Sequence, residues 1–595
     1  MAKRTIKTAI TEIINPTKDM TISFKNANVA NGSKLIFDGN STPIASANGK
    51  DLCIVTLSGN ITGGDASCVV TTIKNYFKYA HTNINLVTVG TSEISAENME
   101  GDEILEVCAI GKGVGYVLGK KKITGMLATS LGGKNATKYD ISSLFVDGFL
   151  IELGGNDKYT YRVKYENADT KLRITDISGN DKYTLINESF TNIYDQKGND
   201  KYTLNTGRST ITDYAGKDKY TLNNTTDSVI DDKAGKDKYT ISNTTKLKLE
   251  DYAGNDKYTF NNVSNADEYG DQIEGYHIKD FLGNDKYTVK GADTNIVLTD
   301  NTGKDTYNIK GSYNKKKKLT TYVGHTEVQD TGDGKNTFNV TYGKDTYLNT
   351  DSAENVYNIK NSVYTKIESK TSLKFTEGVG SKDKYNLTSN EYYEIYDFGT
   401  SNDTYKFKKS ATGFIQDNGG DDTYTIDKLN FKRIETEDTE IHAGLLIRDI
   451  DGNDTLTLKG SKKQNLVFMS DFHKYEDNYI SYNNSLIIYD KSTKGYAYIE
   501  EFFADSDDDY NFDDYGEGKM ETIKAKIGKK VKPLDITTND NYYTNLNSVK
   551  EDVVNWLTTQ SNEGIDFGCV EDVLMYGTNE QKATLVTYFD GTHQG

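Results

Sequence analysis

The sequence is poor in the residues that interrupt or cross-link a chain. Only three of its 595 residues are proline, so no proline-rich linker divides it. The cysteines are scattered and form neither a zinc-type pair nor a disulfide framework; they are Cys53, Cys68, Cys108 and Cys569. A Cys53–Cys68 bridge and buried free thiols both remain open.

Positive charge and long apolar runs are also scarce. The formal net charge is -18, which argues against nucleic acid or an anionic membrane as the main partner, because both attract clustered positive charge. No run of about 18 apolar residues occurs, so we expect no membrane-spanning helix. The N-terminal residues lack the apolar stretch of a signal peptide. We therefore expect either a cytosolic protein or one exported by a C-terminal signal.

Familiar catalytic motifs are missing as well. The sequence contains no His-Glu-x-x-His and no Gly-x-Ser-x-Gly, which counts against zinc metalloproteases and serine lipases. No long segment of the pore-forming kind precedes the repeats described below, which counts against a cytolysin. The six histidines are isolated from one another, at His81, His277, His325, His442, His473 and His593.

What the sequence does have is tyrosine, with 43 residues, and one repeated phrase. The clearest copy runs from Ile211 to Leu222 and contains Asp213, Gly216 and Asp218, followed by Lys, Tyr and Thr. An apolar residue stands two places before the first Asp and another closes the phrase. Copies recur from about residue 150 to about residue 460.

The copies follow one another at a period near 19 residues. Their Gly-x-Asp aspartates are separated by 24, 19, 18, 19, 19, 29 and 20 residues, at Asp157, Asp181, Asp200, Asp218, Asp237, Asp256, Asp285 and Asp305. Weaker copies follow at Asp345, Asp383, Asp403, Asp422 and Asp454. Such a period accommodates two strands and two turns. The sequence therefore predicts a mainly β protein with a right-handed parallel β-roll or β-solenoid of about 19-residue coils.

Each copy carries two aspartates around a glycine-containing turn, a pattern typical of calcium sites. Gly216 suits a turn that needs a positive φ or a close backbone approach, and such a turn presents carbonyl oxygens beside the carboxylates. Many hard oxygen ligands without His or Cys describe a Ca²⁺ site better than a transition-metal site. The predicted metal ligands are Asp157, Asp176, Asp181, Asp195, Asp200, Asp213, Asp218, Asp232, Asp237, Asp251, Asp256, Asp280, Asp285, Asp300, Asp305, Asp417, Asp422, Asp449 and Asp454.

Stacking strengthens this prediction, because equivalent aspartates of successive coils would lie about 4.8 Å apart. Two carboxylates at that separation repel by about 1 kcal/mol in water and by roughly 3–4 kcal/mol at an effective dielectric of 20. Lys219 and its equivalents directly follow the second Asp, but adjacent residues of an extended segment point to opposite faces. Asx-turns and a metal-free Lys–Asp ladder remain the alternatives to calcium.

The tyrosine of each copy predicts the core. Tyr220 and its equivalents recur once per coil and precede an aliphatic residue by two places, so we expect them to stack inside the coils. Ile211 and its equivalents, two places before the first Asp, should form the opposing core row. A solvent-facing aromatic strip that binds sugars is the alternative.

The phrase also carries a resemblance to a known family. Gly-Asn-Asp-Lys-Tyr at Gly179–Tyr183, Gly254–Tyr258 and Gly283–Tyr287 resembles half of the repeat-in-toxin (RTX) nonapeptide. The resemblance implies calcium-loaded parallel β-rolls, export by the type I secretion machinery of a Gram-negative bacterium, and an extracellular or cell-surface location. The family's leading Gly-Gly is replaced here by Asp-x, and the glycine turn comes once per coil, so calcium is expected along one edge only.

Three regions follow from these patterns. Residues 1–145 lack the repeat and form an expected α+β or β-rich cap domain, with a helix over Asp65–His81 and strands over Leu52–Leu57, Ile84–Val89 and Tyr116–Leu118. Residues 146–500 form the calcium-binding array. Residues 501–595 begin with an acidic segment and end in a small α/β tail, similar to RTX C-termini, with an amphipathic helix over Leu546–Gln560 and an apolar run over Leu585–Phe589.

The expected function is that of a non-enzymatic extracellular calcium-binding protein, such as an S-layer, adhesin or matrix component. Its repeats would fold on calcium binding after export, and its partners would be further copies of itself or a cell-surface glycan. One alternative is a secreted RTX-family enzyme with an active site in the N-terminal region. The other is a metal-independent solenoid used for structure or recognition.

Overall fold

The computed structural model describes most of the predicted array and shorter pieces on either side. Residues 171–369 and 382–429 are described with gaps at 187–189, 206, 268–270, 333, 352–353 and 410–411, and residues 444–502 except 451, 475–479 and 501. Residues 520–534 except 521, residues 548–590 except 563, and parts of 2–89 and 122–162 are also described. The acidic segment beyond residue 502 and the predicted strand at Tyr116–Leu118 lie outside the described residues.

Two compact units make up the chain. Unit 1 is Met1–Asp267 with Gln272–Leu282, and unit 2 is Glu268–Asp271 with Gly283–Gly595. The division falls inside the predicted array, and the domain boundaries near residues 145 and 500 stay predictions. The fold is mainly β in both units.

The described N-terminal elements are strands in two sheets. A five-stranded sheet has the order β1 (Ala2–Ile6), β3 (Met20–Phe24), β7 (Ser67–Ile73), β6 (Asp51–Ser58) and β5 (Thr42–Asn48). A three-stranded sheet contains β2 (Thr11–Ile14), β4 (Lys34–Asp38) and β8 (Asn85–Val89). The strands predicted at Leu52–Leu57 and Ile84–Val89 are confirmed.

The helix predicted over Asp65–His81 is wrong, because β7 occupies Ser67–Ile73. This segment reads Ser-Cys-Val-Val-Thr-Thr-Ile, and its β-branched residues favour an extended backbone over a helix. The apolar spacing that suggested a helix face is short enough to fit a strand equally well.

Strand register also decides the open question about the cysteines. In the antiparallel pair β6–β7, Cys53 lies opposite Thr72 and Cys68 lies opposite Leu57. The two cysteines are therefore four residues apart along the ladder, or about 13 Å at the usual rise per residue. A disulfide needs Cα atoms roughly 4.4–6.8 Å apart, so the register excludes a Cys53–Cys68 bridge.

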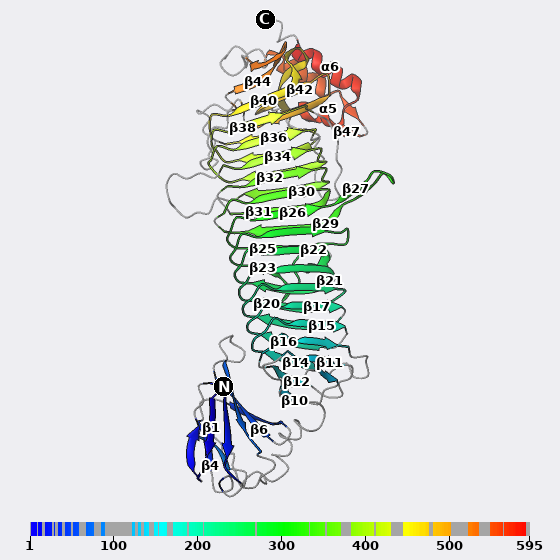
Figure 1. The fold of residues 1–595 in the computed structure, drawn as a ribbon. Helices are drawn as coiled ribbons and strands as arrows, with labels where there is room; N and C mark the ends of the chain where they lie inside the picture. The colour runs from blue at the N-terminus through cyan, green and yellow to red at the C-terminus, as the bar shows by residue number, and fades with distance from the viewer. Residues whose placement is uncertain are drawn as a thin grey trace. The chain divides into compact units, whose positions relative to one another are not determined.

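The repeats of unit 1 build two rows of parallel strands in a solenoid-like stack (Figure 1). One row contains β11 (Lys138–Ile141), β13 (Lys158–Tyr161), β15 (Lys182–Ile186), β17 (Lys201–Asn205), β19 (Lys219–Asn223), β21 (Lys238–Asp251) and β22 (Lys257–Ser264). The other row contains β12 (Gly148–Glu152), β14 (Lys171–Asp176), β16 (Phe190–Asp195), β18 (Arg208–Asp213), β20 (Thr226–Asp232), the second half of β21, and β23 (Ile278–Asp280). One strand from each row, with the turns that join them, is called a repeat below.

Equivalent residues of successive repeats lie opposite one another. Ile193 pairs with Ile211, and Tyr202 pairs with Tyr220. The predicted core is therefore confirmed, because Ile211 and Tyr220 are completely buried. This burial excludes the alternative of a solvent-facing aromatic strip. The rings stack with centroids 4.6–5.0 Å apart, at Tyr139, Tyr159, Tyr183, Tyr202, Tyr220, Tyr239 and Tyr258.

Unit 2 repeats the same design. Its first row contains β24 (Lys286–Lys290), β26 (Thr306–Lys310), β30 (Thr337–Thr341), β32 (Val356–Lys360), β34 (Lys384–Thr388), β36 (Thr404–Lys408), β38 (Thr423–Ile426), β40 (Thr455–Lys462) and β44 (Thr522–Ile527). Its second row contains β25 (Asn295–Asp300), β29 (Val323–Asp330), β31 (Gly343–Thr350), β33 (Tyr364–Ser369), β35 (Tyr392–Asp397), β37 (Thr412–Asp417), β39 (Leu445–Asp449) and β43 (Gly495–Ile499).

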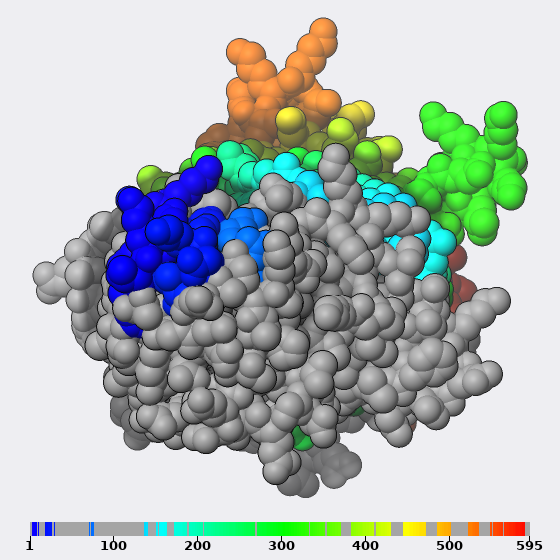
Figure 2. Space-filling model, turned by 60° about the horizontal axis from the view of Figure 1, so that its bottom comes forward, coloured from blue at the N-terminus to red at the C-terminus, as the bar shows by residue number. Residues whose placement is uncertain are grey.

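A hairpin interrupts unit 2 between β26 and β29. It consists of β27 (Ser312–Asn314) and β28 (Leu319–Thr321), with Lys315–Lys318 at its tip, and it stands out as the green protrusion in Figure 2. Asn314 Oδ1 accepts hydrogen bonds from the backbone N–H groups of Lys316 and Lys317, which orders the tip. The basic run is thus an exposed turn.

The C-terminal part of unit 2, called the helical end below, has a conventional apolar core. The antiparallel strands β41 (Leu466–Lys474), β42 (Ile480–Asp490) and β43 pack against α4 (Lys550–Leu557), α5 (Val570–Tyr576) and α6 (Asn579–Asp590). The predicted helix over Leu546–Gln560 is confirmed as α4, and the apolar run Leu585–Phe589 lies in α6. In the described part of the chain, no helix combines the length and the apolar character needed to cross a bilayer.

Candidate metal centre

The two aspartates of each repeat flank one turn of the stack. Asp213 is the last residue of β18, and Asp218 directly precedes β19. Strand alternation places Asp213 on the same side as Ile211, and Asp218 on the same side as Tyr220, which is the inside of the repeat. Lys219 therefore points outward and is exposed, as are its equivalents in the neighbouring repeats.

The predicted ligands are almost completely buried. All nineteen have exposed fractions of 4% or less, from Asp157 in unit 1 to Asp454 in unit 2. Since each lysine lies on the opposite face, no Lys–Asp ladder neutralises these carboxylates, and that alternative is excluded for these residues. Buried charges of one sign need another source of compensation.

Parallel register stacks the aspartates in two columns. Asp195, Asp213 and Asp232 pair with one another in successive strands and form part of the first column. In the second column each carboxylate accepts the backbone N–H of the aspartate one repeat earlier. Asp218 Oδ1 lies 2.6 Å from the amide of Asp200, and Asp237 Oδ1 lies 2.6 Å from the amide of Asp218.

The tyrosine column supplies hydroxyls to the first column. Tyr202 Oη lies 2.8 Å from Asp213 Oδ2, and Tyr220 Oη lies 2.8 Å from Asp232 Oδ2 and 3.3 Å from Asp213 Oδ2. One carboxylate oxygen of each aspartate is thus occupied by a protein donor. The tyrosine ladder is therefore both core and part of the site.

Some of the other carboxylate oxygens accept a backbone N–H two residues on, as Asp213 Oδ1 does from Ala215 at 3.2 Å, but many of those described have no donor. Among the described residues, no hydrogen-bond partner reaches Oδ2 of the second-column residues Asp181, Asp200 and Asp218. The same holds for Oδ1 of the first-column residues Asp195, Asp232 and Asp251. Native proteins rarely leave buried acceptors unpaired, so these oxygens indicate a ligand.

The carboxylates converge in groups of three. Each group joins the second aspartate of one repeat to both aspartates of the next, with ligand atoms within 4.8 Å of one another. In unit 1 the groups include Asp157/Asp176/Asp181, Asp181/Asp195/Asp200, Asp200/Asp213/Asp218, Asp218/Asp232/Asp237 and Asp237/Asp251/Asp256. The predicted site residues of these repeats are therefore brought together as potential metal ligands.

Glycine keeps the space beside these oxygens open. A Cβ atom on Gly216 would lie 2.4 Å from both carboxylate oxygens of Asp218 and 2.4 Å from the carbonyl oxygen of Gly198. Any side chain would therefore fill the gap between the carboxylate and the neighbouring carbonyl. Close approach rather than a positive φ explains the glycine at this position.

Burial and mutual repulsion make the ionised carboxylates costly. Burial, followed by the charge of Asp195, raises the pKa of Asp200 to about 9, although the amide of Asp181 lowers it. Burial raises the pKa of Asp218 to about 6 against the amide of Asp200. The pKa of Asp213 lies well above its usual value because of burial and then Asp195 and Asp218. Cations or protons must therefore accompany these groups in the folded state.

Unit 2 contains further members of the columns. Asp285 donates its N–H to Asp305 Oδ1 at 2.6 Å, Asp417 pairs with Asp449, and Asp422 donates its N–H to Asp454 Oδ1 at 2.7 Å. The structure adds acidic members that the list of predicted ligands lacked: Glu152, Asp330, Asp383, Asp397 and Asp403. An apolar residue two places earlier, such as Val328 before Asp330, was the available signal for the first column.

The interpretation of Asp345 as a member of the array turn is wrong. Gly343–Thr350 forms β31, and Asp345 lies opposite His325 in the middle of the ladder. Its carboxylate Oδ2 lies 3.0 Å from His325 Nδ1 on the outer face. The Gly-Lys-Asp-Thr-Tyr letters match the phrase, but the turn of this repeat comes later, after Thr350.

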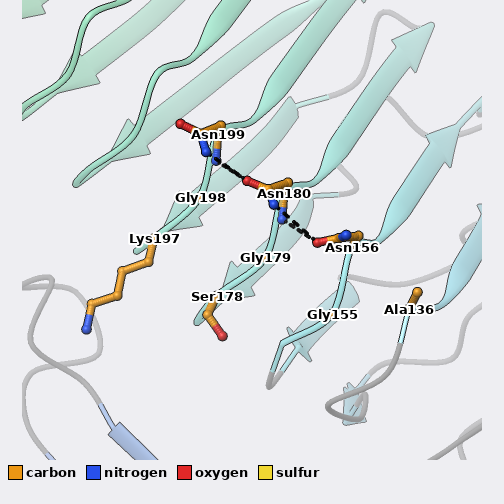
Figure 3. A pocket seen from close by; sticks show the side chains of 9 residues that line it. All are labelled: Ala136, Gly155, Asn156, Ser178, Gly179, Asn180, Lys197, Gly198 and Asn199. Carbon is orange, nitrogen blue, oxygen red and sulfur yellow. Dashed lines mark hydrogen bonds between the residues drawn. The ribbon is translucent and has the colours of Figure 1, made fainter.

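Outside the carboxylate columns, the same turns of unit 1 line a shallow groove of about 640 Å³. Asn156, Asn180 and Asn199 form a ladder along it (Figure 3). Asn180 Oδ1 accepts both the backbone N–H and the side-chain amide of Asn199, at 2.9 and 3.0 Å. The ladder ties successive turns together on the solvent side, while the carboxylates lie on the inner side.

Comparison with known proteins gives no relative from which to transfer a role. No family model, no curated protein and no solved structure matches the chain. The RTX resemblance therefore rests on the motif residues alone, and the chemistry of the columns has to carry the functional argument.

Proposed function

We propose that the carboxylate columns bind Ca²⁺ between successive repeats, within a right-handed β-roll of about 19-residue coils. The observation that carries this proposal is the row of buried carboxylate oxygens that face one another without hydrogen-bond donors. In one such group, Asp218, Asp232 and Asp237 would hold the ion. The proposal makes the protein a calcium-dependent structural repeat protein.

The donor set favours calcium over other metals. All three side chains of a group offer carboxylate oxygen, and the turn adds the carbonyl of Gly198, which lies beside the Asp218 carboxylate. Oxygen donors without nitrogen or sulfur suit Ca²⁺ and Mg²⁺ rather than Zn²⁺. Mg²⁺ usually keeps several waters, whereas these oxygens are buried among protein atoms. Calcium therefore fits the group better.

Bound calcium would supply the positive charge that the columns lack. Without it, each pair of ionised carboxylates at the strand spacing of about 4.8 Å repels by roughly 3–4 kcal/mol at an effective dielectric of 20. The repeats add such terms along the whole column. Folding would then be coupled to calcium, because the unfolded chain holds no preformed site.

This coupling supports an extracellular role. At low cytosolic calcium the columns would disfavour folding and leave the chain competent for type I export, and calcium outside the cell would fold it. The RTX-like motif and the tail resembling RTX C-termini point the same way. We propose a surface-layer, adhesin or matrix protein, assembled from copies of itself or bound to a cell-surface glycan.

A calcium titration of the full chain tests the proposal. Starting in EDTA at pH 7.5, calcium should raise the far-ultraviolet β signal and bind at multiple sites by calorimetry, and magnesium should be much less effective. Asp218→Asn should lower the number of bound ions, while the exposed control Glu274→Gln should not. A chain that is fully folded in EDTA and binds no calcium would refute the proposal.

Assembly is tested separately. Electron microscopy of the purified protein with millimolar calcium should show sheets or filaments, and dispersed single particles would contradict the self-assembly part of the proposal.

A further inference from the structure

The columns of unit 2 change their chemistry in the middle. Between Asp330 and Asp383, four column positions carry neutral side chains: Asn336 and Asn355 in the second column, Thr350 and Ser369 in the first. The backbone register is nevertheless maintained. Asp330 lies opposite Thr350, Thr350 opposite Ser369, and Ser369 opposite Asp397, so the neutral residues occupy the positions of aspartates.

Asn336 is the first neutral residue, and its side-chain amide both accepts and donates a hydrogen bond. Asn336 Oδ1 accepts the backbone N–H of Asp305 at 2.7 Å, as a second-column aspartate would. Its Nδ2 donates to Asp330 Oδ2 at 2.7 Å. Asp330 also accepts the Tyr307 hydroxyl at 2.9 Å. An N–H donor thus stands where the acidic repeats have only oxygens.

The next neutral residues of the columns are also paired donor to acceptor. Thr350 Oγ1 lies 2.7 Å from the Tyr357 hydroxyl and 3.3 Å from Asn355 Nδ2. Ser369 donates its hydroxyl to Asp383 Oδ2 at 2.8 Å, and Asp383 Oδ1 lies 2.5 Å from the amide of Asn355. Each of these contacts joins a donor to an acceptor, where the acidic repeats place acceptor against acceptor.

The ring column changes at the same place. Phe338 takes the position of a tyrosine, stacked between Tyr307 at 4.8 Å and Tyr357 at 5.0 Å. Phe338 has no hydroxyl to donate to Asp330, but Asn336 donates to this carboxylate in its place. The changes in the first column, the second column and the ring column are therefore mutually consistent.

Unpaired oxygens separate the two kinds of repeat. Among the described residues of unit 2, buried carboxylate oxygens without a partner occur at Asp300, Asp403, Asp422 and Asp449. The described residues Asp330, Thr350, Ser369 and Asp383 contribute none. The feature that indicates a cation in the acidic repeats is thus missing from the neutral ones.

We infer that the repeats from Asp330 to Asp383, called the neutral segment, take no cation and divide the ion sites of unit 2 into two rows that load independently. The inference rests on the proposed function. One row contains Asp285, Asp300 and Asp305, and the other runs from Asp397 through Asp403 and Asp417 to Asp454. Asp330 and Asp397 are three strands apart, or about 14 Å at the usual spacing, so repulsion between the rows is weak.

The consequence is a difference in calcium dependence along one continuous ladder. The neutral column positions between Asp330 and Asp383 carry no charge and so add no repulsion to be relieved. The backbone hydrogen bonds around them should therefore survive at calcium levels that open the acidic repeats. Because repeat stability depends on nearest neighbours, protection should fall off on either side of the neutral segment.

Hydrogen exchange on the full-length chain at stepwise lower calcium tests this inference. The amides of β32 should keep their protection at calcium concentrations at least tenfold below those at which β36 and β38 lose theirs. Equal calcium midpoints in β32, β36 and β38 would overturn the inference while leaving calcium binding intact. A chain with no calcium dependence in any strand would instead refute the proposed function.

A gain-of-site variant gives an independent readout. N336D/T350D/N355D/S369D restores three carboxylate groups, so we expect about three more calcium ions per chain by equilibrium dialysis. It should also shift the β32 midpoint to that of β36. The single variant Asn355→Asp is the safer companion if the fourfold variant does not fold: it should make β32 protection calcium-dependent. Unchanged stoichiometry and midpoint in the folded variants would overturn the inference.

Discussion

The acidic repeats and the helical end bury aspartate in opposite ways. In the helical end, Asp471 accepts the amides of Val570 and Glu571 at 3.0 and 3.3 Å, and the Tyr498 hydroxyl at 3.1 Å. In the acidic repeats, carboxylates such as Asp200 and Asp232 present unpaired oxygens to one another. A buried carboxylate is stable where the chain supplies donors, and it needs an external cation where the chain supplies more carboxylates.

The two regions also differ in what surrounds the carboxylates. The helical end packs aliphatic side chains, including Val553, Leu574 and Leu585, into a core of the usual kind. The acidic repeats pack tyrosine rings whose hydroxyls contact carboxylates of the first column, as Tyr202 and Tyr220 do. The first core holds together mainly through apolar burial, whereas the second ties its packing to the charge state of the columns.

The largest expected effect is therefore a split response to calcium removal. EDTA at pH 7.5 should abolish most of the β signal of the repeats, because their columns lose the counter-charge. Trp556 is the only tryptophan, and it packs against the helical end 5.8 Å from Tyr588. Its emission should stay close to that of the calcium-loaded protein. Simultaneous loss of both signals would show that the two regions do not differ in the way described.

Acid should partly replace calcium in the repeats. The folded pKa is raised to about 7 in Asp195, 9 in Asp200 and 6 in Asp218, from a usual 3.8. The folded metal-free form thus holds protons that the unfolded chain releases. Its stability is fully present below about pH 4 and is lost as the pH rises through about 6 to 9, by about 1.4 kcal/mol per unit for each group titrating alone.

Thermal unfolding in EDTA at several pH values measures this effect. The repeats should melt at higher temperature at pH 4.5 than at pH 8, and calcium should reverse the order because protons then compete with the ion. A metal-free chain that is more stable at pH 8 would contradict the assignment.

Single substitutions should separate the two regions by sign. Asp471→Ala removes the acceptor of two buried donors, the Val570 amide and the Tyr498 hydroxyl, and of the part-buried Glu571 amide, so it should destabilise the helical end by about 3 kcal/mol with or without calcium. Asp213→Asn removes one repelling charge, so it should stabilise the metal-free repeats by about 1–2 kcal/mol and destabilise the calcium-loaded ones. Urea unfolding in calcium and in EDTA provides the test, and a sign for Asp213→Asn that does not depend on calcium would rule out its role in the column.

The smallest expected effect concerns the ring column. Tyr220→Phe removes the hydroxyl shared by Asp213 and Asp232 and should cost about 1 kcal/mol in the acidic repeats. Lys219→Ala, at the exposed neighbouring position, should change stability by less than about 0.5 kcal/mol. Comparable losses in the two variants would mean that the hydroxyl does not serve the columns.

Much of the repeat architecture was predictable because one physical argument applies to every copy. Strand alternation alone separates Asp218 and Tyr220, which are buried, from Lys219, which is exposed. The positions of the nineteen predicted ligands follow from that alternation and from parallel register. All nineteen are buried, and those from Asp157 to Asp256 converge in groups of three, while the identity of the metal stays a proposal.

The predictions that were wrong concern segments whose sequence motif does not determine the strand register. Asp345 carries the motif but lies in mid-strand, because Gly343 begins a strand in this repeat and not a turn. Thr350 and Ser369 could not be recognised as column members, since neither is acidic and each is defined only by the strand it pairs with. The helix prediction over Asp65–His81 was wrong for a related reason. A short spacing of apolar residues fits a helix or a strand until the sheet partners are known.

The in-register ladder of rings and carboxylates has a consequence for how such a chain can change length. Each stacked ring, each amide-to-carboxylate bond and each ligand group links only neighbouring repeats. Duplicating or deleting a whole repeat would recreate the same contacts at the junction, without any redesign of the interior. Internal gene duplication could therefore change the number of repeats, and with it the length of the stack. Each remaining repeat would keep its own packing.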